Sequence, residues 1–317
     1  MPAPPSLLKF HTDLDFQHIR VKRPRKFVFF CGGVIGNDDN KPKSLRQYLL
    51  RTRNIAPRIK ADIVLAETAN QLYRDTEFND LITFEEEIAI ISSLVLVIAE
   101  SAGSLAELGA FATSNQIRQT MAVIMRTEHY GQNSFVRYGP IEKLRRENDK
   151  RIGTFPWRSN GHDILVKSSI RDHVRVITDF INSQISIEPD EFLFRSNEQF
   201  QSFCIILWIL HISRAISITE LEDYSSRLGL NITRKDIKNK LYCMKIAGWV
   251  DEYTYSNKTY WHAKTDIDPI CRYSYRDEVI ERDTPRRKLD VTLDIQKDLK
   301  VPTHVARHIN GIVGGQR

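Results

Sequence analysis

The sequence predicts a doubly wound α/β domain with a parallel sheet, followed by a winged helix-turn-helix domain. Three observations support this prediction. Apolar runs alternate with helical patterns over residues 27–188, three helices and a hairpin follow after residue 200, and the length of 317 residues suits two domains. We place a flexible basic arm at 1–26, the α/β domain at 27–188, the winged-helix domain at 189–270 and a charged C-terminal extension at 271–317.

The first 26 residues are rich in proline at the start and basic at the end. We expect a poorly ordered arm there. The charge pattern alone leaves open whether the basic residues are a solvated charge run or contact phosphate groups. These residues are Arg20, Lys22, Arg23, Arg25 and Lys26.

The α/β prediction rests on apolar runs at 26–31, 61–66, 93–99 and 121–125. Helical patterns separate them at about 44–53, 81–91 and 104–118. The run at 93–99 is the strongest strand prediction, because strands of a parallel sheet are covered on both faces and are therefore apolar. Residues 140–197 are mixed, with helices predicted at 141–150 and 168–181. Ligand sites of such sheets lie beyond the carboxyl ends of the strands.

The second domain begins after Glu188-Pro189-Asp190. Helices are predicted at 201–213, 217–229 and 233–246, the last with a capped start at Thr233. A hairpin at 249–255 and 259–263 follows. Three helices and then a two-stranded hairpin is the order of a winged helix.

The composition excludes several classes of protein. A hydrophobic fraction of 41% and a charged fraction of 27% are typical of globular proteins. The N-terminus lacks the pattern of a signal peptide and no run is long enough to span a bilayer, so we expect a cytoplasmic protein without membrane contact. The four cysteines are scattered, which predicts no metal site. A net charge of +6 slightly favours acidic partners such as nucleic acid.

Three features are expected to meet at one edge of the sheet. Small residues after the first strand would let a ligand approach the backbone. Acidic residues follow the second strand and lie on the next helix. A small-residue turn before the helix at 104–118 would present N–H groups to a phosphate or to sugar hydroxyls. These candidates are Cys31, Gly32 and Gly33, then Glu67 and Glu85, then Ser101, Gly103 and Ser104.

Glu107 is the candidate catalytic residue. Cleavage of an N-glycosidic bond develops positive charge on the anomeric carbon, and an ionised carboxylate can stabilise this charge or attack the carbon. With an ordinary pKa of about 4.3, a glutamate is already ionised at neutral pH.

Each of these candidates has a structural alternative. Ser104-x-x-Glu107 has the spacing of a capping box, which on spacing alone is the stronger interpretation of Glu107. Gly32-Gly33 could be an ordinary turn. Glu67 and Glu85 could be surface carboxylates.

The helix at 233–246 has an apolar face and a basic face. Ile237, Leu241 and Met244 should pack inward. We expect the outward face to contact nucleic acid, although a solvated basic face is the alternative. The outward residues are Arg234, Lys235, Lys238 and Lys245, with Asn239 between them. Asp251 and Glu252 in the hairpin would repel a phosphate backbone, which argues against operator recognition.

Three segments together resemble the effector proteins of retrons: FFCGG at 29–33, AESAGSLAELGAF at 99–111 and SFVRYGP at 134–140. Retrons are bacterial anti-phage systems in which a reverse transcriptase makes a branched RNA–DNA hybrid. This effector type looks like a nucleoside deoxyribosyltransferase, a flavodoxin- or Rossmann-like fold, joined to a winged helix. The resemblance covers both domains in the same order.

The resemblance implies a toxin that the reverse transcriptase and its branched RNA–DNA hold inactive until infection. It implies N-glycosidic cleavage of NAD or a related nucleotide as substrate, with no cofactor. The family's catalytic glutamate falls on Glu107 and its second acidic position on Glu85, while Glu67 matches a glutamate after the second strand. By analogy, Asn133 and Tyr138 would close the site from a neighbouring subunit of a homo-oligomer.

One departure from the family pattern concerns the loop before the catalytic helix. The family often has proline on each side of the Glu-Ser dipeptide, where this chain has Ala99 and Ala102. Two other functions stay open: a base-exchange transferase acting on nucleosides or nucleotides, and a nucleotide-sensing DNA-binding regulator.

Overall fold

The computed structural model describes residues 3–68, 78–187, 190–196, 198–264 and 268–314. The chain divides into two compact units. One comprises Lys26–Gln71 and Asp80–Glu188, and the other comprises Met1–Arg25, Leu72–Asn79 and Pro189–Arg317. The first unit contains one sheet and the second contains two, and each unit has its own buried side chains.

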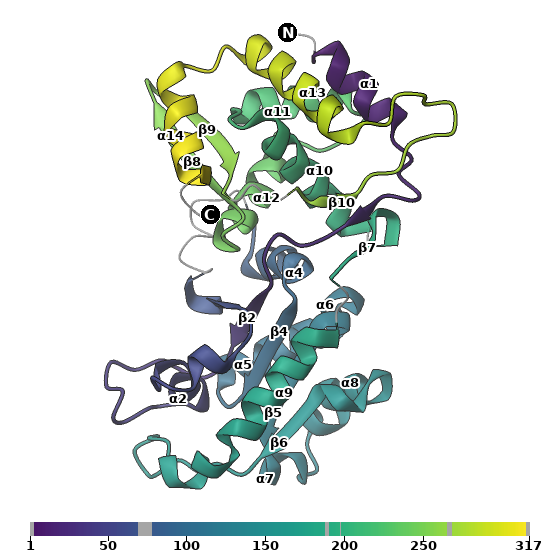
Figure 1. Ribbon diagram of the computed structural model, residues 1–317. Helices are drawn as coiled ribbons and strands as arrows, with labels where there is room; N and C mark the ends of the chain where they lie inside the picture. The colour runs from purple at the N-terminus through teal and green to yellow at the C-terminus, as the bar shows by residue number, and fades with distance from the viewer. Residues whose placement is uncertain (1–2, 69–77, 188–189, 197, 265–267, 315–317) are drawn as a thin grey trace. The chain divides into compact units, whose positions relative to one another are not determined.

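The first unit is built on a five-stranded parallel sheet (Figure 1). Its strands are β2 (Phe27–Cys31), β3 (Asp62–Leu65), β4 (Leu94–Ala99), β5 (Met121–Arg126) and β6 (Ile152–Phe155). They lie in the order β3-β2-β4-β5-β6. The chain therefore leaves β2 toward β3 at one edge and returns to β4 on the other side of β2. The direction of winding reverses between β2 and β4, and such a reversal creates a crevice at the carboxyl ends of these strands.

Four of these strands lie where the apolar runs predict them, whereas β6 was missed. The residues of β6 are Ile-Gly-Thr-Phe, and only alternate positions are buried. A four-residue edge strand with a central glycine carries too weak an apolar pattern to be distinguished from a loop.

Helices cover both faces of the sheet. On one face, the buried cluster joins strand residues such as Val28 and Leu96 to Leu45 and Leu49 of α2 (Leu45–Arg51) and Ile177 of α9 (Val174–Ile187). Because side chains alternate along a strand, Phe27, Phe29 and Cys31 point to the opposite face. That face is covered by α4 (Leu81–Ile91), α5 (Ala102–Thr113) and α6 (Asn115–Thr120). This two-sided cover agrees with the doubly wound arrangement expected from the sequence.

Between β5 and β6 the chain forms α7 (Thr127–Tyr130), a π-helical turn η3 (Arg137–Ile141) and α8 (Glu142–Glu147). The predicted helix at 104–118 is two helices in the structure. Ser114 has an extended backbone that ends α5, and its side chain accepts a hydrogen bond from the N–H of Ile117 in α6.

The second unit contains helices α10 (Glu198–Ser213), α11 (Ile218–Arg227) and α12 (Arg234–Ile246). The antiparallel hairpin of β8 (Val250–Tyr255) and β9 (Lys258–Ala263) follows them, in the predicted order. Capping boxes begin α11, at Ser217 and Glu220, and α12, at Thr233 and Asp236. The capped start predicted at Thr233 is therefore confirmed.

The N-terminal arm expected at residues 1–26 is not flexible in the structure. Residues Pro5–Asp13 form α1, which buries Leu7 and Phe10. Strand β1 (Arg20–Val21) pairs with β7 (Phe192–Leu193) and β10 (Ile270–Arg272) in a small antiparallel sheet. The proline and the basic residues suggested a loose arm. The apolar side chains of Leu7 and Phe10 lie among them, and their burial holds the segment in place.

The charged C-terminal extension is helical. It forms α13 (Thr284–Leu299) and α14 (Thr303–Gly314). Val291, Ile295, Val305 and Ile309 are buried, so the charged residues of this extension surround an apolar face that packs within the second unit. Within the described residues, every helix is too short or too polar to cross a bilayer.

Candidate active site

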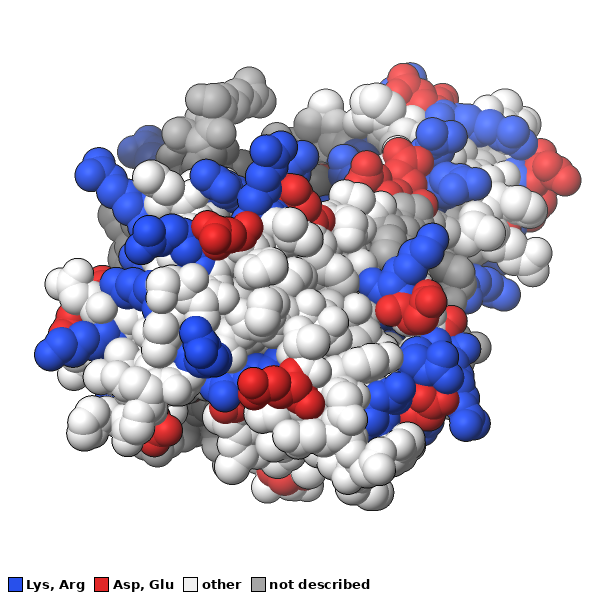
Figure 2. Space-filling view, turned by 90° about the horizontal axis from the view of Figure 1, so that it is seen from below, with Lys and Arg blue, Asp and Glu red and all other residues white. Residues whose placement is uncertain are grey.

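The winding reversal of the first unit places the ends of β2 and β4 side by side. Cys31 ends β2, and it pairs with Val97 two residues before β4 ends at Ala99. In Figure 1, α7 follows β5 directly and lies at the lower end of this unit, so the strands' carboxyl ends point downward. Figure 2 views the molecule from below and shows acidic and basic side chains interspersed rather than a continuous surface of one sign.

The turn after β4 is capped by Ser101 and Ser104. The N–H of Ser104 donates to Oγ of Ser101 at 3.2 Å, and the N–H of Ser101 donates to Oγ of Ser104 at 2.9 Å. The helix therefore begins at Ala102, two residues before the predicted start at 104, and the capping box is Ser101–Ser104 rather than Ser104–Glu107. The capping interpretation of Glu107 is wrong, because this residue lies in the second turn of α5.

Glu107 faces the end of β2. The thiol of Cys31 donates a hydrogen bond to its carboxylate. The second oxygen, Oε2, is buried and has no hydrogen-bond partner among the described residues. Burial raises the pKa of Glu107 to about 7, with a smaller contribution from Glu67, whereas the charge of Arg46 and the Cys31 hydrogen bond lower it. The ordinary value of about 4.3 expected from the sequence is therefore wrong.

Glu85 is the second carboxyl group of this cluster. It lies on α4, which begins at Asp80, and only 5% of the residue is exposed. Burial raises its pKa to about 8, and the charges of Glu107 and Glu67 add to the effect. A surface role for Glu85 is excluded. Near neutral pH, Glu85 holds a proton while Glu107 is partly ionised, and such a division suits an acid and a base of one reaction.

Arg46 belongs to the site, although the sequence analysis missed it. It lies on α2 and is completely buried. Its Nε donates to the carbonyl oxygen of Gly33 at 2.9 Å, and its Nη1 donates to that of Phe30 at 3.2 Å. Nη1 also donates to Oε2 of Glu67 at 2.8 Å, and Nη2 contacts the other oxygen of that carboxylate. Its place three residues before Leu49, on the buried side of α2, is the signal that could have identified it.

The glycines after β2 let side chains of α2 and its N-cap pack closely against the backbone. A Cβ on Gly32 would lie 3.0 Å from Cδ of Arg46, and a Cβ on Gly33 would lie 2.7 Å from Cβ of Ser44. Protein side chains therefore occupy the position that a Cβ would take at each of these glycines. Gly103 differs, because a Cβ there would meet only Oγ of Ser101, at 4.0 Å. The open approach to the backbone lies at the start of α5.

Glu100 is a second residue that the sequence analysis did not select. Its carboxylate accepts hydrogen bonds from the N–H groups of Gly33 at 3.1 Å, Leu45 at 2.7 Å and Arg46 at 3.1 Å. Burial raises its pKa, although the three N–H groups oppose the rise. Glu100 connects the end of β4 to the start of α2 and so positions Arg46.

Asn133 and Tyr138 lie in the segment after β5. The hydroxyl of Tyr138 donates to Oδ1 of Asn133 at 2.7 Å, and the side chains are exposed. The turn η3, which contains Tyr138, packs on α5, the helix that carries Glu107. Phe135, in the same segment, is 84% exposed. Closure of the site by Asn133 and Tyr138 from a neighbouring subunit stays a prediction.

The basic helix α12 is only partly as predicted. Ile237, Leu241 and Met244 are buried, as expected, but Asn239 is also buried, contrary to the prediction. Packing of helix α12 on several sides explains the difference, since α12 contacts α10, α11 and β8.

Several of the basic side chains on α12 have partners within their own unit. Nζ of Lys245 lies 2.7 Å from the Glu252 carboxylate, and Nη1 of Arg234 lies 3.6 Å from Glu222. Nζ of Lys235 donates to Oδ1 of Asn79 at 3.0 Å. Lys238 is half-buried. Lys245 therefore faces an acidic partner rather than open solvent.

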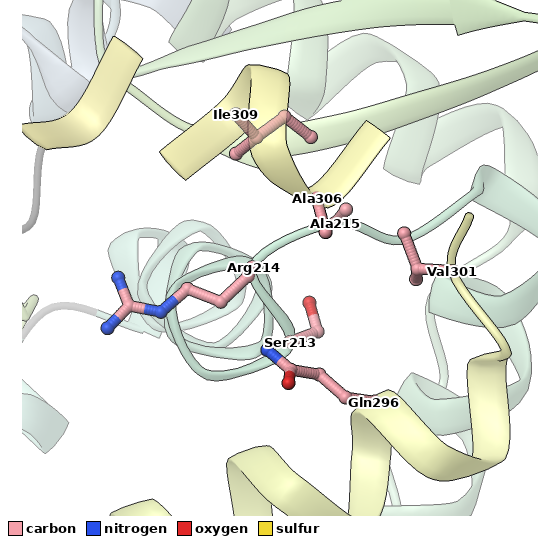
Figure 3. Close-up of a pocket in the computed structure, with 7 residues that line it drawn as sticks. All are labelled: Ser213, Arg214, Ala215, Gln296, Val301, Ala306 and Ile309. Atoms are coloured by element: carbon pink, nitrogen blue, oxygen red, sulfur yellow. The ribbon is translucent and has the colours of Figure 1, made fainter. Parts of the chain in front are cut away.

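A cavity in the second unit is too small to be the substrate site. It has a volume of about 70 Å³ and lies between the end of α10 and the helices α13 and α14. Ala215, Val301 and Ile309 line it, and Figure 3 shows the guanidinium of Arg214 pointing away from it. Ligand pockets commonly measure roughly 300–1,000 Å³. The described residues also hold no cluster of side chains that could bind a metal ion.

Comparison with known proteins gives a consistent result. Residues 42–252 match the model of a family described as "STM3845 retron effector protein". Among curated proteins of Escherichia coli, the "Retron Ec86 putative ribosyltransferase/DNA-binding protein" is 28% identical over 126 residues, 39% of each chain. The "Retron Ec73 putative ribosyltransferase/DNA-binding protein" is 27% identical over 136 residues, 41% of this chain and 42% of that protein. The matched region thus spans about two fifths of each relative.

Proposed function

This chain belongs to the STM3845 retron effector protein family, and we propose that it is a toxin that cleaves the N-glycosidic bond of NAD or a related nucleotide. The observation that carries the proposal is the state of Glu107. Its carboxylate lies where the winding of a parallel sheet reverses, one of its oxygens is buried without a partner among the described residues, and its pKa is about 7. Such a group is suited to stabilise a positive charge that develops beside it.

In the proposed reaction, the bond between C1′ of the ribose and the base nitrogen breaks, and its electron pair leaves with the base. Ionised Glu107 stabilises the positive charge on C1′ or attacks it, and water then supplies the hydroxyl group and releases its second proton to the solvent. Nicotinamide leaves NAD as a neutral molecule and needs no proton. A purine or pyrimidine leaves more easily when it is protonated, and Glu85, with its pKa of about 8, can donate that proton.

We further propose that α10, α11, α12 and the β8–β9 hairpin form a winged helix that binds the retron's branched RNA–DNA or its reverse transcriptase. The order of these elements and the "DNA-binding" part of both relatives' names support this assignment. Binding of these partners would hold the toxin inactive, in the cytoplasm, until infection. A homo-oligomer, in which Asn133 and Tyr138 reach a neighbouring site, fits the same proposal.

The test is to incubate the purified full-length chain with NAD and a panel of nucleotides and to separate the products by chromatography. The Glu107→Gln variant should cleave at least about 100-fold more slowly, because the amide cannot carry the negative charge. Glu86→Gln, a change to an exposed neighbour of Glu85 on α4, should leave the rate unchanged. Full activity of Glu107→Gln would refute the catalytic assignment.

Base exchange is the second candidate, because both relatives are named as ribosyltransferases. A labelled free base added to the reaction separates the two functions. Recovery of the label in intact nucleotide would indicate a transferase, whereas hydrolysis leaves the label in the free base. A nucleotide-sensing regulator would leave every nucleotide intact and would shift a promoter fragment in a salt-dependent manner.

A further inference from the structure

The first unit contains a pocket at the carboxyl edge of its five-stranded sheet. Its volume is about 270 Å³, and it is formed by the residues that follow β5 and β6. Arg126, the last residue of β5, lines one side, and Trp157 and Arg158 line the other. The carboxyl edge of a parallel sheet is where ligands of such folds bind.

Arg126 is a half-buried cation that has no carboxylate partner within the described ranges. Its Nη2 donates to Oγ of Ser159 at 3.0 Å, and its guanidinium carbon lies 5.5 Å from the centre of the Trp157 ring. Its Nε is buried and has no hydrogen-bond partner among the described residues. The ion pairs found within the described ranges do not include Arg126 or Arg158, and Glu128, which also lines the pocket, pairs with neither.

A guanidinium that is partly removed from water, and that has no counter-ion, is costly unless an anion occupies the site in the functional complex. The planar fork of an arginine matches the oxygens of a phosphate group, and a ring beneath it holds the fork in position. Arg158 adds a second positive charge at the exposed side of the pocket. The charge and shape of this pocket therefore favour a phosphate group.

We propose that this pocket binds a phosphate group of the substrate, so that the substrate is a phosphorylated nucleotide rather than a free nucleoside. This inference rests on the proposed function, because it assumes that C1′ lies at Glu107. Strands β2 and β5 are separated by β4, so their ends lie two strand spacings apart, about 10 Å. Arg126 shares the face of Ala122 and Ile124, whereas Glu107 faces Cys31 on the other face of the sheet. The ribose and its pyrophosphate group would therefore lie across the carboxyl edge of the sheet.

The test measures binding of inorganic pyrophosphate to the full-length chain by titration calorimetry. Arg126→Gln should weaken binding at least about tenfold, as expected for the loss of a charged hydrogen-bond partner, and Arg126→Lys should weaken it less. Arg175→Gln, which removes the same charge from an exposed position on α9, should leave binding unchanged. Equal affinity of wild type and Arg126→Gln, or no binding by wild type, would overturn the proposal.

Two further measurements keep this result separate from folding and from the proposed chemistry. Arg158→Gln changes only an exposed side chain and should weaken pyrophosphate binding by a smaller factor, without a change in thermal unfolding. Glu107→Gln should bind pyrophosphate as wild type does. If the wild type cleaves no nucleotide but Arg126→Gln still binds pyrophosphate more weakly than the wild type does, the phosphate site is supported and the proposed function is wrong.

The source of the phosphate is decided by competition. If the pocket serves the substrate, pyrophosphate competes with the nucleotide, and Arg126→Gln raises KM for nucleotides while kcat stays near that of wild type. Cleavage of a nucleoside without phosphate should not respond to this substitution. If pyrophosphate binds at Arg126 without competing with the nucleotide, the ligand is a free phosphate compound and the assignment to the substrate is wrong.

Discussion

Arg46 and Glu67 form an ion pair in which only one partner is buried. The side chain of Arg46 is 1% exposed, whereas that of Glu67 is 54% exposed. Water screens the glutamate more than the arginine, so the positive charge acts mainly on the buried groups around it. Its effect on Glu107 is to lower the pKa of that carboxyl group, against the larger effect of burial.

Replacement of Arg46 should shift the pH dependence of cleavage. In Arg46→Met, the pKa of Glu107 loses the influence that lowers it and rises above about 7. The ionised form that the reaction needs then appears at higher pH, so the acidic limb of the kcat/KM profile moves to higher pH. Arg46→Lys keeps the charge and should move the limb less. An unchanged acidic limb in Arg46→Met would contradict this role.

Glu85→Gln should stabilise the protein at alkaline pH. The folded-state pKa of Glu85 is raised from 4.5 to about 8, so protonated Glu85 favours folding, and its contribution is lost as pH rises from about 4.5 through about 8. Glutamine stays neutral over this range. The advantage of Glu85→Gln in thermal or denaturant unfolding should therefore be absent near pH 4 and grow to a few kcal/mol above about pH 8. The exposed control Glu86→Gln should show no such dependence.

Glu100→Ala should destabilise the first unit by at least about 2 kcal/mol, because three backbone N–H groups lose their acceptor. Glu100→Gln keeps one acceptor oxygen and should lose less. Denaturant unfolding measures both changes. Since Glu100 also positions Arg46, any remaining cleavage by Glu100→Gln should show the same upward shift of the acidic limb as Arg46→Met. A wild-type free energy of unfolding in Glu100→Ala would exclude this structural role.

The cysteines should differ in reactivity. Burial raises the pKa of Cys31 and Cys204 well above the ordinary value, while Cys271 is partly exposed. Alkylation with iodoacetamide should therefore modify Cys271 first, and Cys31, Cys204 and Cys243 only in denaturant. Peptide mass spectrometry locates the label, and Cys271→Ser should stay unlabelled while folded. Early labelling of Cys31 would show that the end of β2 is open to solvent.

The basic residues of α12 should contribute unequally to nucleic-acid binding. Arg234 is exposed and lies 3.6 Å from its nearest acidic partner, whereas Lys245 is paired at 2.7 Å with Glu252. Arg234→Ala should reduce the slope of log affinity against log salt concentration by about one, as expected for the loss of one phosphate contact. Lys245→Ala should leave the slope unchanged. The opposite ranking in a titration with single-stranded DNA or an RNA–DNA hybrid would refute a docking role for this face.

Local patterns were enough to predict much of the fold. The apolar runs at 26–31, 61–66, 93–99 and 121–125 correspond to β2, β3, β4 and β5, because short apolar runs that alternate with helical patterns are typical of strands in a parallel sheet covered by helices. Threonine at the start of α12 indicated the cap of that helix. The pattern failed at β6 and at residues 1–26, where the apolar residues are few or stand among basic ones and proline.

The sequence by itself determined the class of fold and the carboxyl groups expected at the carboxyl edge of its sheet. The tertiary structure decided where the winding reverses and which side chains surround those carboxyl groups. Arg46 meets Glu67 across 21 positions, and Leu45 meets Glu100 across 55, so no local pattern records these pairs. The pKa values of Glu85 and Glu107 follow from burial, and burial exists only after distant segments pack around a side chain.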